Sequence, residues 1–398
     1  MCSVTGAAAA CLSAVAFASL MSEVERGATL RACHIIHSLG RGGAESVLLE
    51  LARVAPAAGL ELSVVSLMPL PPEGSLAPEL RAAGTSVVSL DLADRWDPRA
   101  FLRAQHIITQ VAPDIVHTHL KHADLVGGVV AARKRLPHVS TLHVVEDAVG
   151  GLGRAKRLAA SVLRRQAAAA TIAVSEAQRQ WYLGLTGAPP DSVVTMYNGV
   201  SRAEPLEEDR RTALRNEAGA RDDSVLVLMV AIMRPGKGHE DLFQAIDALA
   251  DDDGVVFALA GDGPERAHLE GLAARRPKVR RRVRFLGYRD DVQEVISAAD
   301  LVVHPTHADA LPTALIQAQA AGVPTIASDV GGVPEVVVEG TGRLVPPRSP
   351  SALARALEEL IGDAAARDAM GRAARTHFDA AFASDVWVRN LMALYRSL

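Results

Sequence analysis

The sequence is poor in cysteine and in aromatic residues. Its three cysteines (Cys2, Cys11 and Cys33) all precede residue 34, which excludes a disulfide framework spanning the fold and favours a reducing compartment. Aromatic residues make up 4% of the 398 residues, so the cores must be built from Ala, Val and Leu. After residue 21, no apolar run reaches the ~20 residues that a membrane-spanning helix needs. We therefore expect a cytoplasmic protein.

The sequence also lacks a large excess of positive or negative residues. Lys plus Arg number 42 against 46 for Asp plus Glu, and the net charge of −4 gives no general attraction to nucleic acid or to an anionic membrane. A basic stretch at 154–165 allows peripheral membrane contact at most, and a solvated helix face explains it more simply. Any site for a polyanion must therefore be local. Only five of the 42 cationic residues are lysines: Lys121, Lys134, Lys156, Lys237 and Lys278.

The N-terminal segment lacks the basic region of a signal peptide. Residues 6–21 are apolar and small, but no cluster of Lys or Arg precedes them. Met21 and Ser22, followed by a charged stretch, resemble an alternative start. We expect residues 1–28 to be a tail, either disordered or a misassigned start.

Length and patterning predict two α/β domains. At roughly 150 residues per domain the chain is long enough for two, and 49% apolar with 22% charged residues excludes general disorder. From residue 30 onward, short β-branched runs alternate with helical stretches, a pattern typical of parallel sheets built from βαβ units. The first series of expected strands comprises Arg31–His37, Leu60–Leu67, Thr85–Leu90, Ile115–His119, Val139–His143, Thr171–Ser175 and Val193–Tyr197. The second comprises Val225–Ile232, Val255–Ala260, Val283–Leu286, Leu301–His304, Thr325–Ser328 and Gly342–Val345.

A polar segment without a strand signal, Ser201–Asp223, follows the first series and marks the junction between the domains. We expect a first doubly wound domain at 29–199 and a second at 200–378, followed by a C-terminal helix at 379–398. Two such domains in tandem place a cleft between the carboxyl ends of their strands, where ligands bind in sheets of this kind.

The first expected strand runs into a glycine-rich loop, Gly40–Glu45. Gly42 and Gly43 let the backbone approach a ligand, and the N-terminus of the next helix offers N–H groups to a phosphate. The loop is not a good dinucleotide fingerprint, because Glu45 occupies the third glycine position and no acidic residue ends the second strand. A tight turn without a ligand is the alternative.

Two cations lie in the loop after the first strand of the second domain. Arg234 and Lys237, with two glycines beside them, precede a helix whose dipole adds to their charge. This arrangement suits a diphosphate. The alternative is a solvated loop with ordinary surface charge.

Two further loops follow strands of the second domain. The run Gly261–Glu265, which includes Gly263, is typical of a turn that starts a helix, and a structural role is its simpler interpretation. The run Gly287–Val292, which includes Arg289, opens another helix, and its backbone can edge a nucleotide base.

The stretch from His304 to Glu335 is the most informative. A polar loop ends a strand, a helix starts near Pro312, and a Gly-Gly turn opens the next helix. Asp309 and Gln317 are eight residues apart, about two helical turns, so both can face the cleft. Backbone N–H groups near Leu311–Thr313 can bind phosphate.

Histidines cluster at the end of one strand of the first domain. His117 and His119 share one face of the strand, and His122 is close in sequence. A metal site needs a third ligand of suitable geometry, so strand-end histidines lining the cleft are the favoured interpretation and zinc is the alternative.

The order of these motifs resembles the family 4 retaining glycosyltransferases of the GT-B fold. The resemblance covers about residues 30–395: a Gly-Gly loop, the R-x-x-K loop, G-D-G-P-E, and the segment ending G-V-P-T-I-A-S-D-V-G-G-V-P-E-V-V. It implies two Rossmann-like domains facing a cleft, with a nucleotide-sugar donor held mainly by the second domain and the acceptor mainly by the first. It also implies a C-terminal helix that crosses back onto the first domain.

The resemblance assigns roles to individual residues. Arg234 and Lys237 would hold the diphosphate in place of a metal ion, and His143 would lie near the donor sugar. The two glutamates of the family's E-x7-E pair fall on Asp309 and Gln317. Asp309 keeps the carboxylate that touches the sugar, whereas Gln317 offers the ribose one acceptor and one donor group instead of a carboxylate. The remaining candidate donor-binding residues are Gly42, Gly43, Gly263, Arg289, Ala310, Leu311, Pro312 and Thr313.

The sequence therefore predicts a metal-independent retaining glycosyltransferase without a cofactor. Its donor would be a UDP-hexose or UDP-N-acetylhexosamine, and its acceptor a metabolite, a lipid-linked intermediate or a polysaccharide. The resemblance also implies attack from the front face, with the leaving diphosphate taking the acceptor proton, which would make positioning and charge stabilisation the protein's main contributions. The alternatives are a nucleotide-sugar epimerase of the same fold and a catalytically silent binding subunit.

Overall fold

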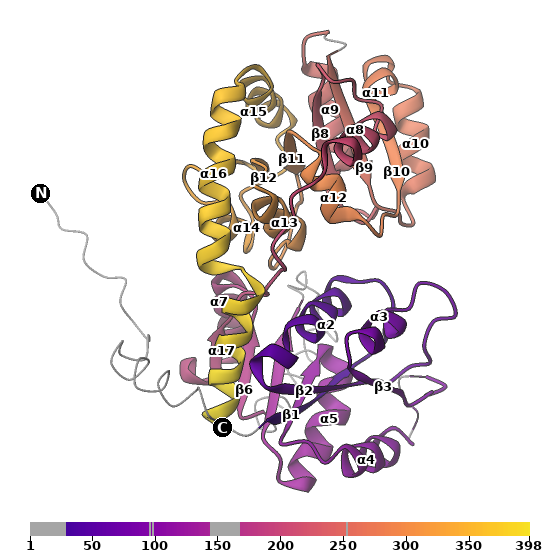
Figure 1. Ribbon diagram of the computed structural model, residues 1–398, viewed down its shortest axis with the longest axis vertical. Coiled ribbons are helices and arrows are strands. Elements are labelled where there is room, and N and C mark those ends of the chain that lie inside the picture. The colour runs from indigo at the N-terminus through magenta and orange to yellow at the C-terminus, as the bar shows by residue number, and fades with distance from the viewer. Residues whose placement is uncertain (1–28, 95–96, 98, 144–167, 252–253) are drawn as a thin grey trace, which may run out of the picture.

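The computed structural model describes residues 29–94, 97, 99–143, 168–251 and 254–398 (Figure 1). The expected N-terminal tail, the first two cysteines and the basic stretch at 154–165 lie outside these ranges. In the described residues, no helix is both long enough and apolar enough to cross a bilayer.

The first domain is a seven-stranded parallel sheet in the order β3-β2-β1-β4-β5-β6-β7. Its central strands are buried on both faces, which explains their nearly continuous apolar runs. The strands are β1 (Leu30–Ile36), β2 (Leu60–Ser66), β3 (Ser86–Ser89), β4 (Ile115–His119), β5 (His138–Leu142), β6 (Ala170–Ala173) and β7 (Val193–Thr195). The described α-helices are α2 (Gly43–Val54), α3 (Ala77–Ala82), α4 (Ala100–Val111), α5 (Leu120–Lys134) and α7 (Glu176–Thr186).

The second domain repeats this architecture with six parallel strands in the order β10-β9-β8-β11-β12-β13. Its strands are β8 (Val225–Val230), β9 (Val255–Ala260), β10 (Val283–Gly287), β11 (Leu301–His304), β12 (Thr325–Ser328) and β13 (Gly342–Val345). Its helices are α8 (Glu208–Glu217), α9 (His239–Ala248), α10 (Arg266–Ala274), α11 (Pro277–Arg282), α12 (Val292–Ser297), α13 (Thr313–Ala321), α14 (Val333–Val336), α15 (Pro350–Gly362) and α16 (Ala364–Ala381). All thirteen strands lie within two residues of the expected limits, and the α/β fold class is confirmed.

The last helix, α17 (Ser384–Arg396), leaves the second domain and packs on the first, against α2 (Figure 1). Its buried residues recur at helical spacing and join the core of the first domain: Trp387, Val388, Leu391, Met392 and Tyr395. The limit expected at residue 378 falls within the last turn of α16.

Two chain crossings between the domains run side by side. Val200 N donates to Phe382 O at 2.9 Å, and Ser384 N donates to Val200 O at 3.0 Å. Glu50 of α2 accepts from both the backbone N and the Oγ of Ser201. The linker near residue 200 is thereby fastened to the start of α17 and to the first domain.

Candidate functional site

The loop after β8 carries the two cations expected to meet a diphosphate. Lys237 lies just before α9, and its Nζ is 2.7 Å from Oδ2 of Asp309. The same oxygen lies 3.2 Å from Nε2 of His304, the last residue of β11. Arg234 is exposed and forms no ion pair with any residue that the structure describes. The fold thus joins Lys237 to Asp309 and leaves the guanidinium of Arg234 available to a ligand.

Asp309 is held as a carboxylate. Burial would raise its pKa, but the hydrogen bond from His304 and the charge of Lys237 overcome this effect and hold the pKa well below its usual range. His239, the first residue of α9, has its pKa lowered to about 4 by burial, with smaller contributions from His304 and Lys237. At neutral pH the site therefore has a carboxylate at Asp309 beside the amine of Lys237, with neutral imidazole at His239.

The segment before α13 presents mainly backbone. Ala310 and Leu311 are 6% exposed and belong to the core of the second domain, so their side chains serve packing. Pro312 precedes the helix and Thr313 begins it, close to the expected start. The first turn of a helix leaves N–H groups without partners inside the helix, and these are the groups a phosphate accepts from. Gln317 is half-buried one turn further on.

Gly263 has a packing reason to be glycine. Its φ is 158°, and a Cβ there would strike the backbone of Met233 in the cation loop. Hydrogen bonds between Met233 N and Asp262 O, at 2.9 Å, and between Glu265 N and Met233 O, at 3.0 Å, hold the two loops together. The turn therefore supports the cation loop through backbone contacts, which agrees with the structural interpretation of this motif.

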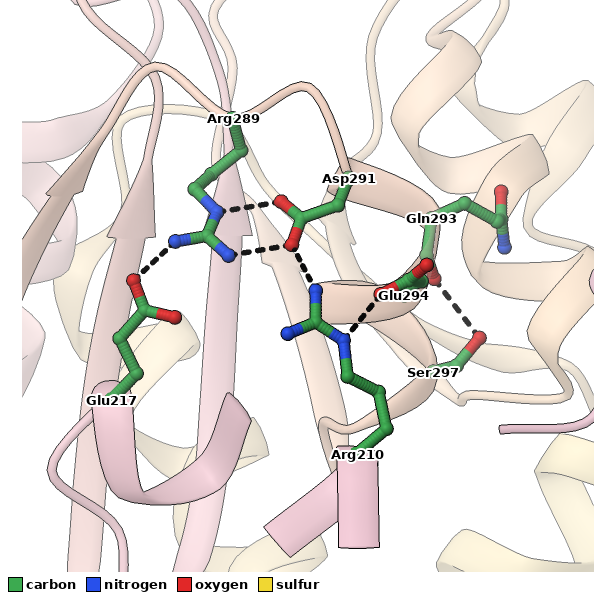
Figure 2. A network of polar contacts seen from close by, with 7 residues as sticks. All are labelled: Arg210, Glu217, Arg289, Asp291, Gln293, Glu294 and Ser297. Atoms are coloured by element: carbon green, nitrogen blue, oxygen red, sulfur yellow. Dashed lines mark hydrogen bonds and ion pairs between the residues drawn. The ribbon is translucent and has the colours of Figure 1, made fainter. Parts of the chain in front are cut away.

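The side chain of Arg289 is committed to carboxylates (Figure 2). Its Nε and Nη2 donate to the two oxygens of Asp291, both at 2.7 Å, and Nη1 contacts Glu217 of α8. Arg210 bonds Asp291 from the other side and continues to Glu294. The hydrogen bonds to Asp291 and Glu217 raise the pKa of Arg289. These contacts use three of the five N–H groups of the guanidinium, and the expected part of Arg289 in donor binding stays a prediction.

The glycine-rich loop of the first domain touches the second domain. Gly42 caps α2 and Gly43 starts it, with open space where a Cβ would stand at Gly43. Between β1 and α2, Arg41 reaches across: its Nη1 donates to the hydroxyl of Tyr288 at 2.7 Å and its guanidinium pairs with Asp290. The guanidinium also lies over the ring of Tyr288, 4.9 Å from its centre. Sequence reasoning missed this bridge, since the partners are 247 residues apart.

A second bridge joins α14 and α7. The carboxylate of Glu335 accepts from the backbone N–H groups of Glu176 and Ala177, at 2.7 and 2.8 Å. These two N–H groups open α7, so the carboxylate sits at the positive end of that helix. Both bridges lie beyond the carboxyl ends of strands, which places those edges of the two sheets against each other.

The strand-end histidines are more deeply buried than expected. His117 and His119 are 2% and 3% exposed, and each is hydrogen bonded on both ring nitrogens, so they lie inside the first domain rather than lining a cleft. His143, directly after β5, is only half-buried and bonds His119 through its Nε2 at 2.8 Å. His34, which sequence reasoning did not select, stands beside His117 in register. His34, His117 and His119 place one ring nitrogen each within 4.8 Å of one another, near enough for a metal to be considered.

Two family profiles match the chain, one in each domain. The profile described as Glycosyltransferase Family 4 matches residues 41–204, and the profile described as Glycosyl transferases group 1 matches residues 210–377. Together they cover every strand of the two sheets except β1.

Curated relatives are also named as glycosyltransferases. A D-inositol 3-phosphate glycosyltransferase of Kineococcus radiotolerans is 32% identical over 290 residues, covering 66% of this chain and 67% of that protein. An uncharacterised glycosyltransferase of Methanocaldococcus jannaschii is 28% identical over 260 residues, covering 63% of this chain. The match spans 66% of the archaeal protein, slightly under two thirds of its length.

Solved structures share the fold. The crystal structure of Anabaena Alr3699/HepE in complex with UDP matches with a TM-score of 0.80 at 21% identity, covering 93% of this chain and all of that chain. The same protein in complex with UDP-glucose gives a TM-score of 0.79. At this identity the likeness concerns the fold, and it confirms the expected pair of Rossmann-like domains.

Proposed function

Because the chain belongs to the group 1 glycosyltransferases, with a family 4 first domain, we propose that it is a retaining, metal-independent enzyme that uses a UDP-sugar. The donor is a UDP-hexose or UDP-N-acetylhexosamine, and the acceptor supplies a hydroxyl group. The solved relative from Anabaena, which binds UDP and UDP-glucose, supports the choice of nucleotide.

The observation that carries the proposal is the unequal state of the two cations. Lys237 is already neutralised by Asp309, whereas Arg234, three residues earlier in the same loop, is exposed and unpaired among the described residues. An exposed guanidinium beside a helix N-terminus favours a compact anion that accepts several hydrogen bonds. A diphosphate meets this requirement. Its negative charge would also interact with Lys237, which already contacts the carboxylate of Asp309.

In the proposed reaction, the bond from the sugar to the diphosphate breaks while the acceptor hydroxyl approaches the same face. Negative charge grows on the leaving phosphate, and Arg234 and Lys237 stabilise it more strongly there than in the bound donor. Asp309 fixes Lys237 and orients hydroxyl groups of the sugar. His143 hydrogen bonds near the C6 hydroxyl, and the departing diphosphate accepts the acceptor's proton.

A panel of UDP-sugars tests the proposal through release of UDP, measured with and without an acceptor. An inositol phosphate is the first acceptor to try, because the relative from Kineococcus is named for it. We expect acceptor-dependent release that persists in EDTA, and a product whose anomeric proton shows the donor's configuration. Conversion of the donor to an epimer without acceptor would identify an epimerase. Binding of UDP without any turnover would identify a silent subunit.

A further inference from the structure

A continuous line of hydrogen bonds runs through the first domain from Thr141 to His143. Thr141 Oγ1 lies 2.7 Å from His117 Nε2, and His117 Nδ1 lies 2.5 Å from the hydroxyl of Tyr395. That hydroxyl is 3.0 Å from His34 Nε2, whose Nδ1 is 2.9 Å from His119 Nε2. His119 Nδ1 is 2.8 Å from His143 Nε2. Each interior member uses both of its polar positions.

The line is built by strand register and by the last helix. His34 of β1 is paired with His117 of β4, and His119 is paired with Thr141 of β5, so all of them project toward one face of the sheet. That face is covered by α2 and α17. Tyr395, at the end of α17, supplies the hydroxyl that closes the gap between His117 and His34. The helix that crosses from the second domain is therefore a member of the line.

The rings in this line are neutral at ordinary pH. Burial lowers the pKa of His34 to about 3 and that of His143 to about 4, although the charge of Asp124 partly opposes the shift at His143. Burial lowers the pKa of His117 and His119 well below the usual value, and neighbouring histidines lower it further. Burial also raises the pKa of Tyr395.

Because the rings are neutral, the donors and acceptors along the line must alternate in one direction. A neutral imidazole has one N–H donor and one acceptor nitrogen, and the tyrosine hydroxyl donates a single hydrogen. If every hydrogen bond is made, all the protons must point the same way. In one direction His143 accepts at Nε2 and carries its proton on Nδ1; in the other it donates from Nε2 and offers an acceptor at Nδ1. The tautomer of the half-buried ring is thus coupled to those of partners up to two strands away, and the line as a whole has only two proton arrangements.

We propose that Tyr395, His34 and His119 are positioning residues that hold His143 in one tautomer and one orientation for contact with the donor sugar. The proposal rests on the proposed function for the contact itself, but the fixed tautomer stands without it. It also means that α17, which follows the second domain in the chain and packs on the first, takes part in arranging the site.

The first test reads the ring of His143 directly in the unliganded protein. In long-range ¹H–¹⁵N spectra of histidine-labelled protein, we expect His143 to be a single neutral tautomer in the wild type. Tyr395→Phe removes one oxygen atom and cuts the line in the middle, so the His143 signals should move toward a mixture of tautomers. Thr141→Val cuts the line at its end and serves as the second variant. Unchanged His143 signals in both variants, or mixed tautomers in the wild type, would overturn the proposal.

The second test separates positioning from stability. With a UDP-sugar that is turned over, Tyr395→Phe should lower kcat/KM by about three- to tenfold, the value of one hydrogen bond, while the Kd of UDP, which lacks the sugar, stays the same. Tyr182→Phe is the matched control, since Tyr182 and Tyr395 are both buried at 2% exposure. Equal kinetic effects of the two variants would assign Tyr395 a structural role only. If no UDP-sugar is turned over, the proposed function fails while the tautomer measurement still decides this inference.

Metal analysis of the purified chain gives an independent check. Both ring nitrogens of His34 and of His119 are already hydrogen bonded. A stoichiometric transition metal that disappears in His34→Gln would contradict the line and would make the three clustered histidines ligands instead. We expect no such metal.

Discussion

The carboxyl edges of the two sheets meet at the domain boundary, but they are built from opposite chemistry. The edge of the second domain carries full charges: Arg234 is exposed, and Lys237 is paired with Asp309. The edge of the first domain carries imidazoles whose pKa values are lowered by burial, the outermost being His143. The same doubly wound scaffold thus gives one edge suited to a phosphate anion and another suited to uncharged hydroxyl groups.

The difference arises from burial and from what covers each edge. In the first domain, α17 closes over the histidines and removes them from water, so charging them is costly. In the second domain, both cations lie in a loop before a helix N-terminus; Arg234 is exposed to solvent or a ligand, whereas Lys237 is half-buried against Asp309.

Acid titration should separate the four clustered histidines of the first domain from Asp309 of the second by several kcal/mol of unfolding free energy, with His239 adding one ring to the histidine window. Histidines of the unfolded chain take up protons below about pH 6.5, whereas the buried rings stay neutral until pH 4 or lower. As the pH falls through this window, each ring therefore lowers the free energy of unfolding by about 1.4 kcal/mol per pH unit. Asp309 has a lowered pKa, so its contribution is present above about pH 4 and is lost only as the pH falls further. Denaturant unfolding at a series of pH values measures both slopes.

Two variants show which residue causes each slope of unfolding free energy against pH. His34→Gln should reduce the slope between pH 6.5 and 4 by roughly one proton, and Asp309→Asn should change it only below about pH 4. His106→Gln, on the exposed surface of α4, is the control for the histidine change. An unchanged slope in His34→Gln would mean that the ring is protonated in the folded state.

Removing one charge from the edge of the second domain should have the largest effect on catalysis. Lys237→Ala should lower turnover by about 100-fold or more, since charge stabilisation of the leaving phosphate is lost and Asp309 is left beside His304 alone. UDP release from the accepted donor measures this loss. Lys134→Ala, exposed in the last turn of α5, should behave as the wild type. Full turnover in Lys237→Ala would contradict the assignment of the diphosphate to this edge.

Adding a negative charge to the edge of the second domain should increase its difference from the neutral edge of the first domain. Gln317→Glu replaces a mixed donor and acceptor with a carboxylate that accepts from both ribose hydroxyls, so UDP should bind about fivefold more tightly. Calorimetry with UDP measures the change, and Gln317→Ala provides the opposite arm. If the glutamate variant binds UDP no better, another group recognises the ribose.

The smallest effect is expected where the two edges touch. Arg41→Met removes the bridge to Tyr288 and Asp290, an exposed contact worth about 1 kcal/mol or less. Fluorescence transfer between labels on the two domains should show a broader range of distances. Arg31→Met breaks an exposed ion pair within the first domain and should leave the distances unchanged. Identical distributions would show that Glu335 and the paired crossings hold the domains without Arg41.

The sequence predicted most of the fold because its signals are local. Strand limits follow from β-branched runs, and the start of α13 follows from Pro312 and the change of periodicity. The cation loop was found for the same reason, since Arg234, Lys237 and two glycines are neighbours in the chain.

The features that were missed depend on pairing between distant segments. His34 and Tyr395 are 361 residues apart and meet only because β1 lies beside β4 and α17 returns to cover them. The contact between Arg289 and Glu217, 72 residues earlier, likewise has no sequence signal. Register and long-range ion pairs are properties of the assembled sheets, which a periodic pattern does not encode.

Calorimetry with UDP and with uridine tests the central claim most directly. The account predicts that the wild-type chain binds UDP much more tightly than uridine, and that Arg234→Ala combined with Lys237→Ala removes this advantage while leaving the affinity for uridine unchanged. An undiminished preference for UDP in the double variant would contradict it, because the diphosphate would then be held somewhere other than at the charged edge of the second domain.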